Sequence, residues 1–151
     1  MPAVPTQLRP YAAADEAAAI ELWRRTWQTT YPSIDFGTRV AWWTERWRSK
    51  LVPRATIVVA EAAGLLVGFV TVEQDTGYLD QIVVAPECWG DGLAETLLAE
   101  ARRLSPKQLV LHVNTDNTRA IHFYEKHGFT FAGDDINPVS GRPVYRMRWR
   151  P

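Results

Sequence analysis

Near the start of the chain, two segments carry apolar residues at every third or fourth position, the period of an amphipathic helix. The first segment covers residues 13–31, and Pro32 ends it. Its apolar face contains Ile20, Trp23, Trp27 and Tyr31. The second follows Asp35, a favourable N-cap residue, and closes at Pro53. Its apolar face contains Val40, Trp43, Trp47 and Leu51. We predict two helices, with Trp23, Trp43 and Trp47 in the core.

After residue 55 the pattern changes to β-branched runs separated by turn residues, which predicts strands. Strands are expected at Thr6–Pro10, 55–62, Leu65–Glu73, Tyr78–Val84, 108–113, 129–134 and Pro143–Trp149. Helical periodicity returns from Gly90 to Leu104 and again over residues 117–128. The order β, α, α, β, β, β, α, β, α, β, β predicts a mixed sheet flanked by helices. We therefore expect one α/β (α+β) domain over residues 1–151.

Composition narrows the class of protein. The chain of 151 residues is 46% hydrophobic with a formal net charge of zero, which gives no broad electrostatic footprint for nucleic acid. Its one cysteine cannot form an internal disulfide, which fits a reducing cytoplasm. The first residues lack the pattern of a signal peptide, and no apolar run is long enough to span a bilayer. No His/Cys cluster has metal-ligand spacing. We expect no metal, no membrane and no nucleic-acid partner.

The stretch PECWGDGLAETLL, residues 86–98, joins a predicted strand to a predicted helix through two glycines. Free N–H groups and the helix dipole attract anions at a helix start, and glycine lets a ligand approach the backbone. A strand-to-helix turn that merely needs flexible φ angles would look the same. The turn is not a Walker A loop, and it lacks the third glycine of a Rossmann turn.

A second element, NTDNTRAIHFYEKHGF from Asn114 to Phe129, places Asn117, Ala120 and Tyr124 on one helix face. Together with the glycine turn, it resembles the GNAT superfamily of acyl-CoA-dependent N-acetyltransferases. The family's first motif, Q/R-x-x-G-x-G/A, is similar to the turn formed by Trp89, Gly90, Asp91, Gly92, Leu93 and Ala94. Its second, N-x-x-A-x-x-x-Y-x-K-x-G-F, matches Asn117, Ala120, Tyr124, Lys126, Gly128 and Phe129. The resemblance extends over residues 55–149.

The resemblance implies a GNAT-like fold with a mostly antiparallel sheet of about seven strands and about four helices, and acetyl-CoA as co-substrate. The coenzyme would contact both motifs, from Trp89 to Ala94 and at Asn117, Ala120 and Tyr124. Main-chain groups of Ile82, Val83 and Val84 would pair with the pantetheine amides. Two residues depart from the family pattern: Trp89 replaces Gln or Arg, and Asp91 replaces a frequent cation. Asp91 should then point to solvent, with Arg102, Arg103 or Arg119 as supplementary cations.

The implied chemistry is direct acetyl transfer to a primary amine of a small molecule or peptide. At the motif's tyrosine, Tyr124 is expected to protonate the coenzyme thiolate, although a packed tyrosine on an amphipathic helix is the alternative. Asn117 is expected to bind the pantetheine arm, to cap its helix, or to do both. A base must remove the amine proton. Asp80 and Glu73 are the candidates on the central strands, and strand alternation places Asp80 on the face of Ile82 and Val84, opposite Gln81.

Trp27, Tyr31 and Phe36 flank the loop between the first two helices, which in this family often borders the acceptor site. Asp134, Asp135 and the turn at residues 137–142 are candidates for the opposite wall, or form a solvated hairpin. His112 is expected to be a satisfied core histidine, and Cys88 a structural thiol. The C-terminal strand could pair with the edge of a second copy in a homodimer.

Two other functions remain open. One is a non-catalytic acyl-CoA-binding or sensing module, which the acid at Asp91 and the undetermined base would suit. The other is a nucleotide-binding α/β protein, which the missing third glycine and the matched helix face argue against.

Overall fold

The computed structural model describes residues 5–151, so the first four residues of the expected domain lie outside it. Seven strands form one sheet in the order β1-β2-β3-β4-β5-β7-β6. The strands are β1 (Thr6–Pro10), β2 (Thr56–Ala62), β3 (Leu65–Glu73), β4 (Tyr78–Val84), β5 (Leu109–Asn114), β6 (Thr130–Ile136) and β7 (Pro143–Trp149). Five neighbouring pairs are antiparallel and only β4 and β5 run parallel. The expected mostly antiparallel sheet is confirmed.

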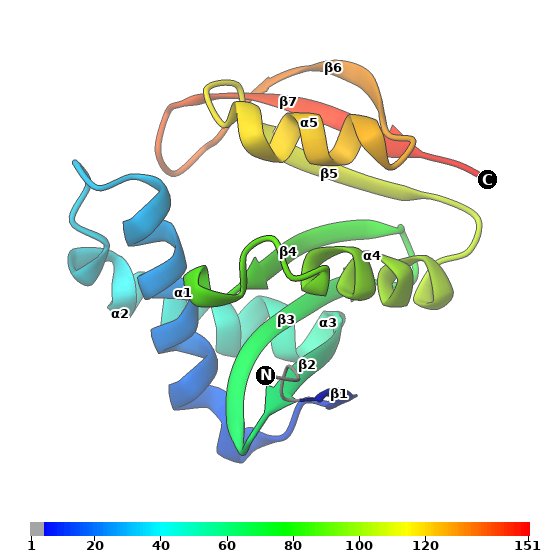
Figure 1. The fold of residues 1–151 in the computed structure, drawn as a ribbon. Coiled ribbons are helices and arrows are strands. Elements are labelled where there is room, and N and C mark those ends of the chain that lie inside the picture. The colour runs from blue at the N-terminus through cyan, green and yellow to red at the C-terminus, as the bar shows by residue number, and fades with distance from the viewer. Residues whose placement is uncertain (1–4) are drawn as a thin grey trace.

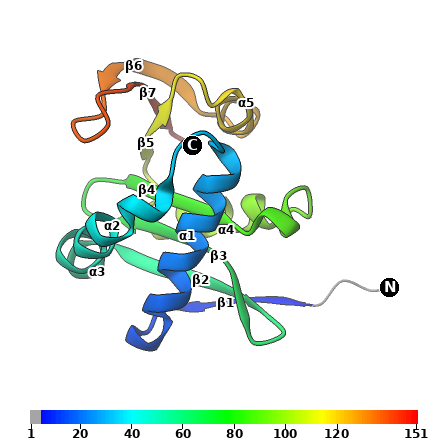
Figure 2. The same cartoon turned by 90° about the vertical axis from the view of Figure 1, so that its left-hand side faces the viewer.

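The helices are α1 (Glu16–Thr30), α2 (Val40–Arg46), α3 (Val52–Arg54), α4 (Leu93–Leu104) and α5 (Thr118–Lys126). A π-helical turn over Trp47–Leu51 joins α2 to α3, so one helical segment extends from residue 40 to Arg54, one residue beyond Pro53. In Figures 1 and 2, α4 and α5 lie on one side of the sheet, whereas α2 and α3 lie on the other.

Two consecutive residues of β3 show how the helices cover both faces of the sheet. Phe69 packs its ring edge-on against Trp47, with 5.3 Å between the ring centroids. On the opposite face, a Cβ at Gly68 would lie 3.1 Å from Leu97 Cδ1 of α4 and 2.9 Å from the Val83 carbonyl oxygen. Glycine at this position therefore allows α4 to pack close to the sheet.

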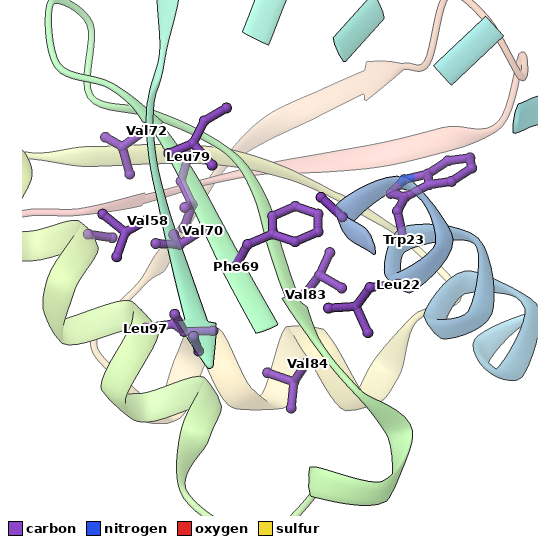
Figure 3. Close-up of a cluster of buried hydrophobic side chains, with 14 of the residues drawn as sticks. Leu22, Trp23, Val58, Phe69, Val70, Val72, Leu79, Val83, Val84 and Leu97 are labelled. Atoms are coloured by element: carbon purple, nitrogen blue, oxygen red, sulfur yellow. The ribbon is translucent and has the colours of Figure 1, made fainter. Parts of the chain in front are cut away.

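An aromatic cluster holds the first helical segments on the sheet. Trp23 of α1 and Trp43 of α2 stack with 4.6 Å between their ring centroids, and Trp47 continues the cluster toward β3. All three side chains are buried, as predicted. Figure 3 shows Phe69 and Val83 of the sheet beside Leu22 and Trp23 of α1. This packing fixes the C-terminal half of α1 next to β4.

The C-terminal strand is not at an edge of the sheet. β7 pairs with β5 on one side and with β6 on the other, so β1 and β6 are the edge strands. The expectation that β7 could pair with a second copy was therefore wrong, because its hydrogen-bonding groups already have partners within the chain.

Candidate active site

The sheet opens between its two parallel strands. β4 and β5 are in register only at Tyr78 and Val110, and beyond this point they diverge, as Figure 1 shows. On the other side of β4, Val83 pairs with Phe69, and the Ala85 N–H donates to the Val67 carbonyl oxygen at 2.8 Å. Main-chain groups of alternate residues face opposite sides of a strand.

This alternation decides which residues of β4 offer main-chain groups to the gap. Val83 turns its N–H and carbonyl toward β3, which limits the expected ligand pairing to Ile82 and Val84. The Val84 carbonyl already accepts a hydrogen bond from the Trp89 indole N–H at 2.8 Å. Both main-chain groups of Ile82 and the Val84 N–H therefore face the gap.

A β-bulge displaces Asp80 from the regular pattern. Thr71 is opposite Gln81 and Val72 is opposite Leu79, so Asp80 is the extra residue in β4. The prediction that Gln81 faces away from Asp80 was wrong, because the bulge interrupts alternation and both side chains line the same cavity. Bulges often redirect a side chain next to an active site.

A cavity of about 550 Å³ lies between α1, β4, α5 and the start of α4. Several residues expected to contact the coenzyme line it: Ile82, Val83, Val84, Trp89, Gly90, Gly92, Ala94, Asn117, Ala120 and Tyr124. The other two do not. Asp91 is exposed outside the cavity, and the Leu93 side chain is buried in the core. The two motifs, far apart in sequence, thus form one cavity.

The glycine turn leaves main-chain donors free. Gly90 and Gly92 have φ angles of 88° and 85°, which glycine adopts without strain, and Gly92 is the N-cap of α4. Within residues 5–151, the N–H groups of Gly92, Leu93 and Ala94 donate no hydrogen bond. A Cβ at either glycine would meet nothing within 4 Å. The turn therefore has open space and free donors, which fits a phosphate group at a helix N-terminus.

Only one of the three proposed supplementary arginines borders this cavity. Arg119 of α5 lies over the Trp89 ring, with its guanidinium carbon 4.0 Å from the ring centroid, and it lines the cavity. Arg102 instead stacks on Trp149 and donates to the His127 carbonyl, and Arg103 pairs with Glu100. Trp89, which replaces the Gln or Arg of the family motif, thus provides an aromatic surface for a cation from α5.

A second cavity, of about 950 Å³, adjoins the first. Its lining includes the three expected acceptor residues, Trp27, Tyr31 and Phe36. Trp27 and Tyr31 stack with their ring planes 8° apart. Both cavities share Trp27, Tyr31, Ile82, Asn117, Ala120 and Tyr124. The two spaces therefore meet beside Tyr124.

Tyr124 and Asn117 come from the same face of α5. Tyr124 is buried against Phe129, and burial raises the pKa of its phenol, so the hydroxyl stays protonated at neutral pH. No residue within 5–151 forms a hydrogen bond with this hydroxyl. Asn117 caps α5 by accepting the Ala120 N–H at 3.3 Å. Its Nδ2 makes no hydrogen bond within the described residues, so capping leaves a donor for a ligand.

The expected bases are poorly placed. Arg46 donates two hydrogen bonds to Asp80, at 3.0 and 2.5 Å, and Gln81 donates a third at 3.1 Å. A partly buried arginine therefore holds this carboxylate in an ion pair. Glu73 ends β3 and lines neither cavity. The ion pair of Asp80 and the position of Glu73 outside both cavities favour neither residue as the base, and the assignment of the base stays a prediction.

A different set of polar groups lines the second cavity. The Tyr78 hydroxyl oxygen is 2.8 Å from His112 Nδ1, and His112 Nε2 is 3.3 Å from Asp135 Oδ2. His112 is not a core histidine, since its side chain is 34% exposed. Asp135 forms part of the opposite wall as expected, whereas Asp134 does not line the cavity. Tyr78 was missed, because only the parallel pairing of β4 with β5 brings it beside His112.

Hydrogen bonds also connect the end of α1 to the far half of the sheet. The Tyr31 hydroxyl donates to Asp116 at 2.7 Å and accepts from Asn114 at 3.1 Å. Arg142, from the turn between β6 and β7, donates to Asp116 at 2.8 Å and lies over the Tyr31 ring. Burial and then the Asp116 carboxylate raise the pKa of Tyr31 to about 12. These contacts bridge the opening at the end of α1.

Comparison with known proteins agrees with this arrangement. The sequence model of the Acetyltransferase (GNAT) family matches residues 17–129. The chain belongs to the GNAT family of acetyltransferases. As a GNAT protein it is an acyl-CoA-dependent N-acetyltransferase that uses acetyl-CoA. Among residues 5–151 we find no group of side chains that could hold a metal ion and no helix that could cross a membrane.

Of three relatives of this GNAT chain, two cover most of it and one covers less than half. Peptidyl-lysine N-acetyltransferase YjaB of Salmonella typhimurium is 30% identical over 125 residues, covering 82% of this chain and 83% of that protein. Spermidine N(1)-acetyltransferase of Vibrio cholerae is 36% identical over 69 residues, covering 41% and 40%. PaiA N-acetyltransferase from Thermoplasma acidophilum, solved with coenzyme A, has a TM-score of 0.81 at 22% identity, covering 97% and 99%. That structure shares the fold.

Removing the Arg119 guanidinium should weaken coenzyme binding. We expect Arg119→Ala to raise the acetyl-CoA dissociation constant about fivefold, which corresponds to about 1 kcal/mol for a partly exposed charge. Isothermal titration calorimetry measures this change, and the exposed Arg103→Ala serves as the control. Equal affinities for the two variants would contradict a role for Arg119.

Replacing the acid in the glycine turn should strengthen binding. Because Asp91 is exposed beside the free N–H groups, Asp91→Lys replaces a repulsive charge with an attractive one. We expect tighter binding of acetyl-CoA and a larger rise in melting temperature with coenzyme. Asp75→Lys, in an exposed turn outside both cavities, controls for net charge. An unchanged affinity in Asp91→Lys would place the coenzyme phosphates away from this turn.

Proposed function

We propose that the protein transfers the acetyl group of acetyl-CoA directly to a primary amine of a small molecule or peptide. The supporting observation is the meeting of two cavities beside Tyr124, one bordered by free main-chain donors and the other by aromatic side chains. In this proposal the glycine turn holds the coenzyme phosphates. Ile82, Val84 and Asn117 Nδ2 bind the pantetheine arm, which extends the sheet at its open edge.

Within this class of acceptors, the side-chain amine of a lysine in a peptide is the favoured substrate. The peptidyl-lysine N-acetyltransferase relative covers four fifths of the chain. Charges around the acceptor cavity also favour an acceptor with a single amine. Of the charged residues that line this cavity, Asp80 is paired with Arg46 and Arg142 with Asp116, while Arg39 has no ion-pair partner within the described residues. A polyamine would bring several ammonium groups to a cavity with few free carboxylates.

Direct transfer is preferred to an acetylated enzyme intermediate. Cys88 is the thiol at the first cavity, and burial followed by Glu87 and Asp91 raises its pKa. A raised pKa lowers the fraction of thiolate, which is the nucleophilic form. Tyr124, protonated at neutral pH, is the proposed acid for the departing coenzyme thiolate. Positioning in the joined cavities would supply much of the remaining rate.

We also propose a cytoplasmic location, which suits the unpaired Cys88 thiol. If two copies form a homodimer through the C-terminal half of their sheets, the edge strand available for pairing is β6, because β7 is paired on both sides.

Turnover tests the proposed function. The purified protein is incubated with acetyl-CoA and a lysine-containing peptide, and thiol release is followed, with spermidine in parallel. We expect release that depends on both substrates, with a higher kcat/KM for the peptide than for spermidine, and no acetylated protein by mass spectrometry when the acceptor is omitted. Coenzyme binding without thiol release for any amine would indicate instead a non-catalytic acyl-CoA-binding or sensing module.

Loss of the Tyr124 hydroxyl should affect the chemical step. We expect Tyr124→Phe to lower kcat roughly 100-fold, within the usual range for a general acid, while the KM for acetyl-CoA and the melting temperature change little. Tyr145→Phe, on β7 and outside both cavities, is the matched control. A kcat within threefold of wild type, about 0.7 kcal/mol, would exclude Tyr124 as the proton donor.

A further inference from the structure

The acceptor cavity contains one uninterrupted set of hydrogen-bonding side chains from three strands. Tyr78 comes from β4, His112 from β5 and Asp135 from β6, and all three line the cavity that Tyr124 also lines. The separations are 2.8 Å between Tyr78 and His112 and 3.3 Å between His112 and Asp135. Asp80 is held by Arg46 and Glu73 lies outside the cavity, whereas these three groups connect the cavity to a partly exposed histidine.

Their chemistry determines the direction of each hydrogen bond. An ionised carboxylate only accepts, so His112 Nε2 carries the proton that faces Asp135. In a neutral imidazole the other nitrogen is then an acceptor, so Nδ1 accepts the hydrogen bond that the Tyr78 hydroxyl donates. The Ile136 main-chain N–H, which donates to Asp135 at 2.9 Å, lowers the pKa of that carboxyl and keeps it ionised.

We infer that Tyr78, His112 and Asp135 form the proton relay that deprotonates the acceptor amine. The inference rests on the proposed transfer to an amine. Tyr78 is the catalytic residue that meets the ammonium group, His112 is the final proton acceptor, and Asp135 is a positioning residue. The relay therefore works without a free carboxylate on a central strand.

The transfer balances in protons and bonds. One ammonium proton moves to the Tyr78 oxygen as the Tyr78 hydroxyl proton moves to His112 Nδ1, which leaves a neutral amine and an imidazolium beside Asp135. The amine nitrogen then bonds to the thioester carbon and the carbon–sulfur bond breaks. The coenzyme thiolate takes the hydroxyl proton of Tyr124. The Tyr124 oxygen then takes the surplus proton from the nitrogen of the new amide. Solvent takes the proton from the partly exposed His112.

The surroundings suit a neutral tyrosine that passes a proton on. Burial and then the Asp80 carboxylate raise the pKa of Tyr78 to about 12, so the phenol remains protonated in the resting state. The charged groups around the relay are Asp80, Arg46 and Glu73 near Tyr78, Asp135 on β6, and Arg146, which is opposite His112 on β7. Arg146 donates to the Ala132 carbonyl at 2.8 Å, and its charge also helps to lower the pKa of the Asp135 carboxyl.

The test measures kcat/KM against pH, from about pH 5 to pH 9, with the amine that turnover assays identify. Wild-type activity should fall at low pH, because a protonated His112 cannot accept the amine proton. We expect His112→Gln and Tyr78→Phe to lower kcat roughly 100-fold, and the histidine-dependent fall at low pH to disappear in His112→Gln. His122→Gln, an exposed histidine on α5, and Tyr145→Phe are the controls.

Asp135 is tested by conservative replacement. Asp135→Asn should lower kcat and shift the low-pH fall to lower pH, because the imidazolium loses its carboxylate partner. Asp135→Glu should restore part of the lost kcat and return the low-pH fall part of the way to its wild-type pH. A merely structural Asp135 would alter stability without moving the pH profile.

A second measurement does not require turnover. Nitrogen-15 NMR of the histidine ring should show His112 with an unprotonated Nδ1 and a protonated Nε2 at neutral pH, and the Nδ1 signal should move in Tyr78→Phe. The opposite tautomer, or a His112→Gln enzyme that keeps a third or more of its kcat (about 0.7 kcal/mol) and its low-pH fall, would overturn the relay while leaving the proposed function intact. A wild-type protein that acetylates no amine would overturn the proposed function itself and, with it, the role of the relay.

Discussion

The separation of β4 from β5 is the constraint on which the site depends. A central strand normally has hydrogen-bonding partners on both sides, and unpaired main-chain groups away from water are costly. Here Ile82 and Val84 turn main-chain groups toward a gap because the two parallel strands are in register only at Tyr78 and Val110. The gap must be filled by water or by a ligand with alternating donors and acceptors. A strand-like pantetheine arm meets that requirement.

The aromatic cluster packs the first helices on the sheet and also borders the acceptor cavity. Stacking between Trp23 and Trp43 holds α1 and α2 together, and the contact of Trp47 with Phe69 fixes them to β3. Further along α1, Trp27 and Tyr31 leave the core and line both cavities. One helix face thus changes from core to cavity wall along its length, so the rigidity of the core extends to the groups that would hold an acceptor.

Charge at the two cavities is arranged through pairs that join separate elements. Arg119 of α5 lies over Trp89 near the glycine turn, and Arg46 of α2 holds Asp80 at the bulge of β4. The Asp80 pair is partly buried, and two hydrogen bonds from Arg46 hold the carboxylate in place. In the proposed relay, proton transfer falls to a tyrosine, a histidine and an aspartate on β4, β5 and β6, with β7 between the last two strands.

The sequence by itself determined the elements, the motifs and the family. The boundaries of Leu65–Glu73, Tyr78–Val84 and Pro143–Trp149 follow from local alternation and turn residues, and the motif spacing around Asn117 and Tyr124 is a property of one helix. The tertiary structure decided the rest. It inserted a bulge at Asp80, placed Arg46 on that carboxylate, exposed His112 beside Tyr78 and brought Arg119 over Trp89. Each of these contacts joins residues that are distant in the chain, and periodicity describes only neighbours, so strand order and helix packing had to be known first.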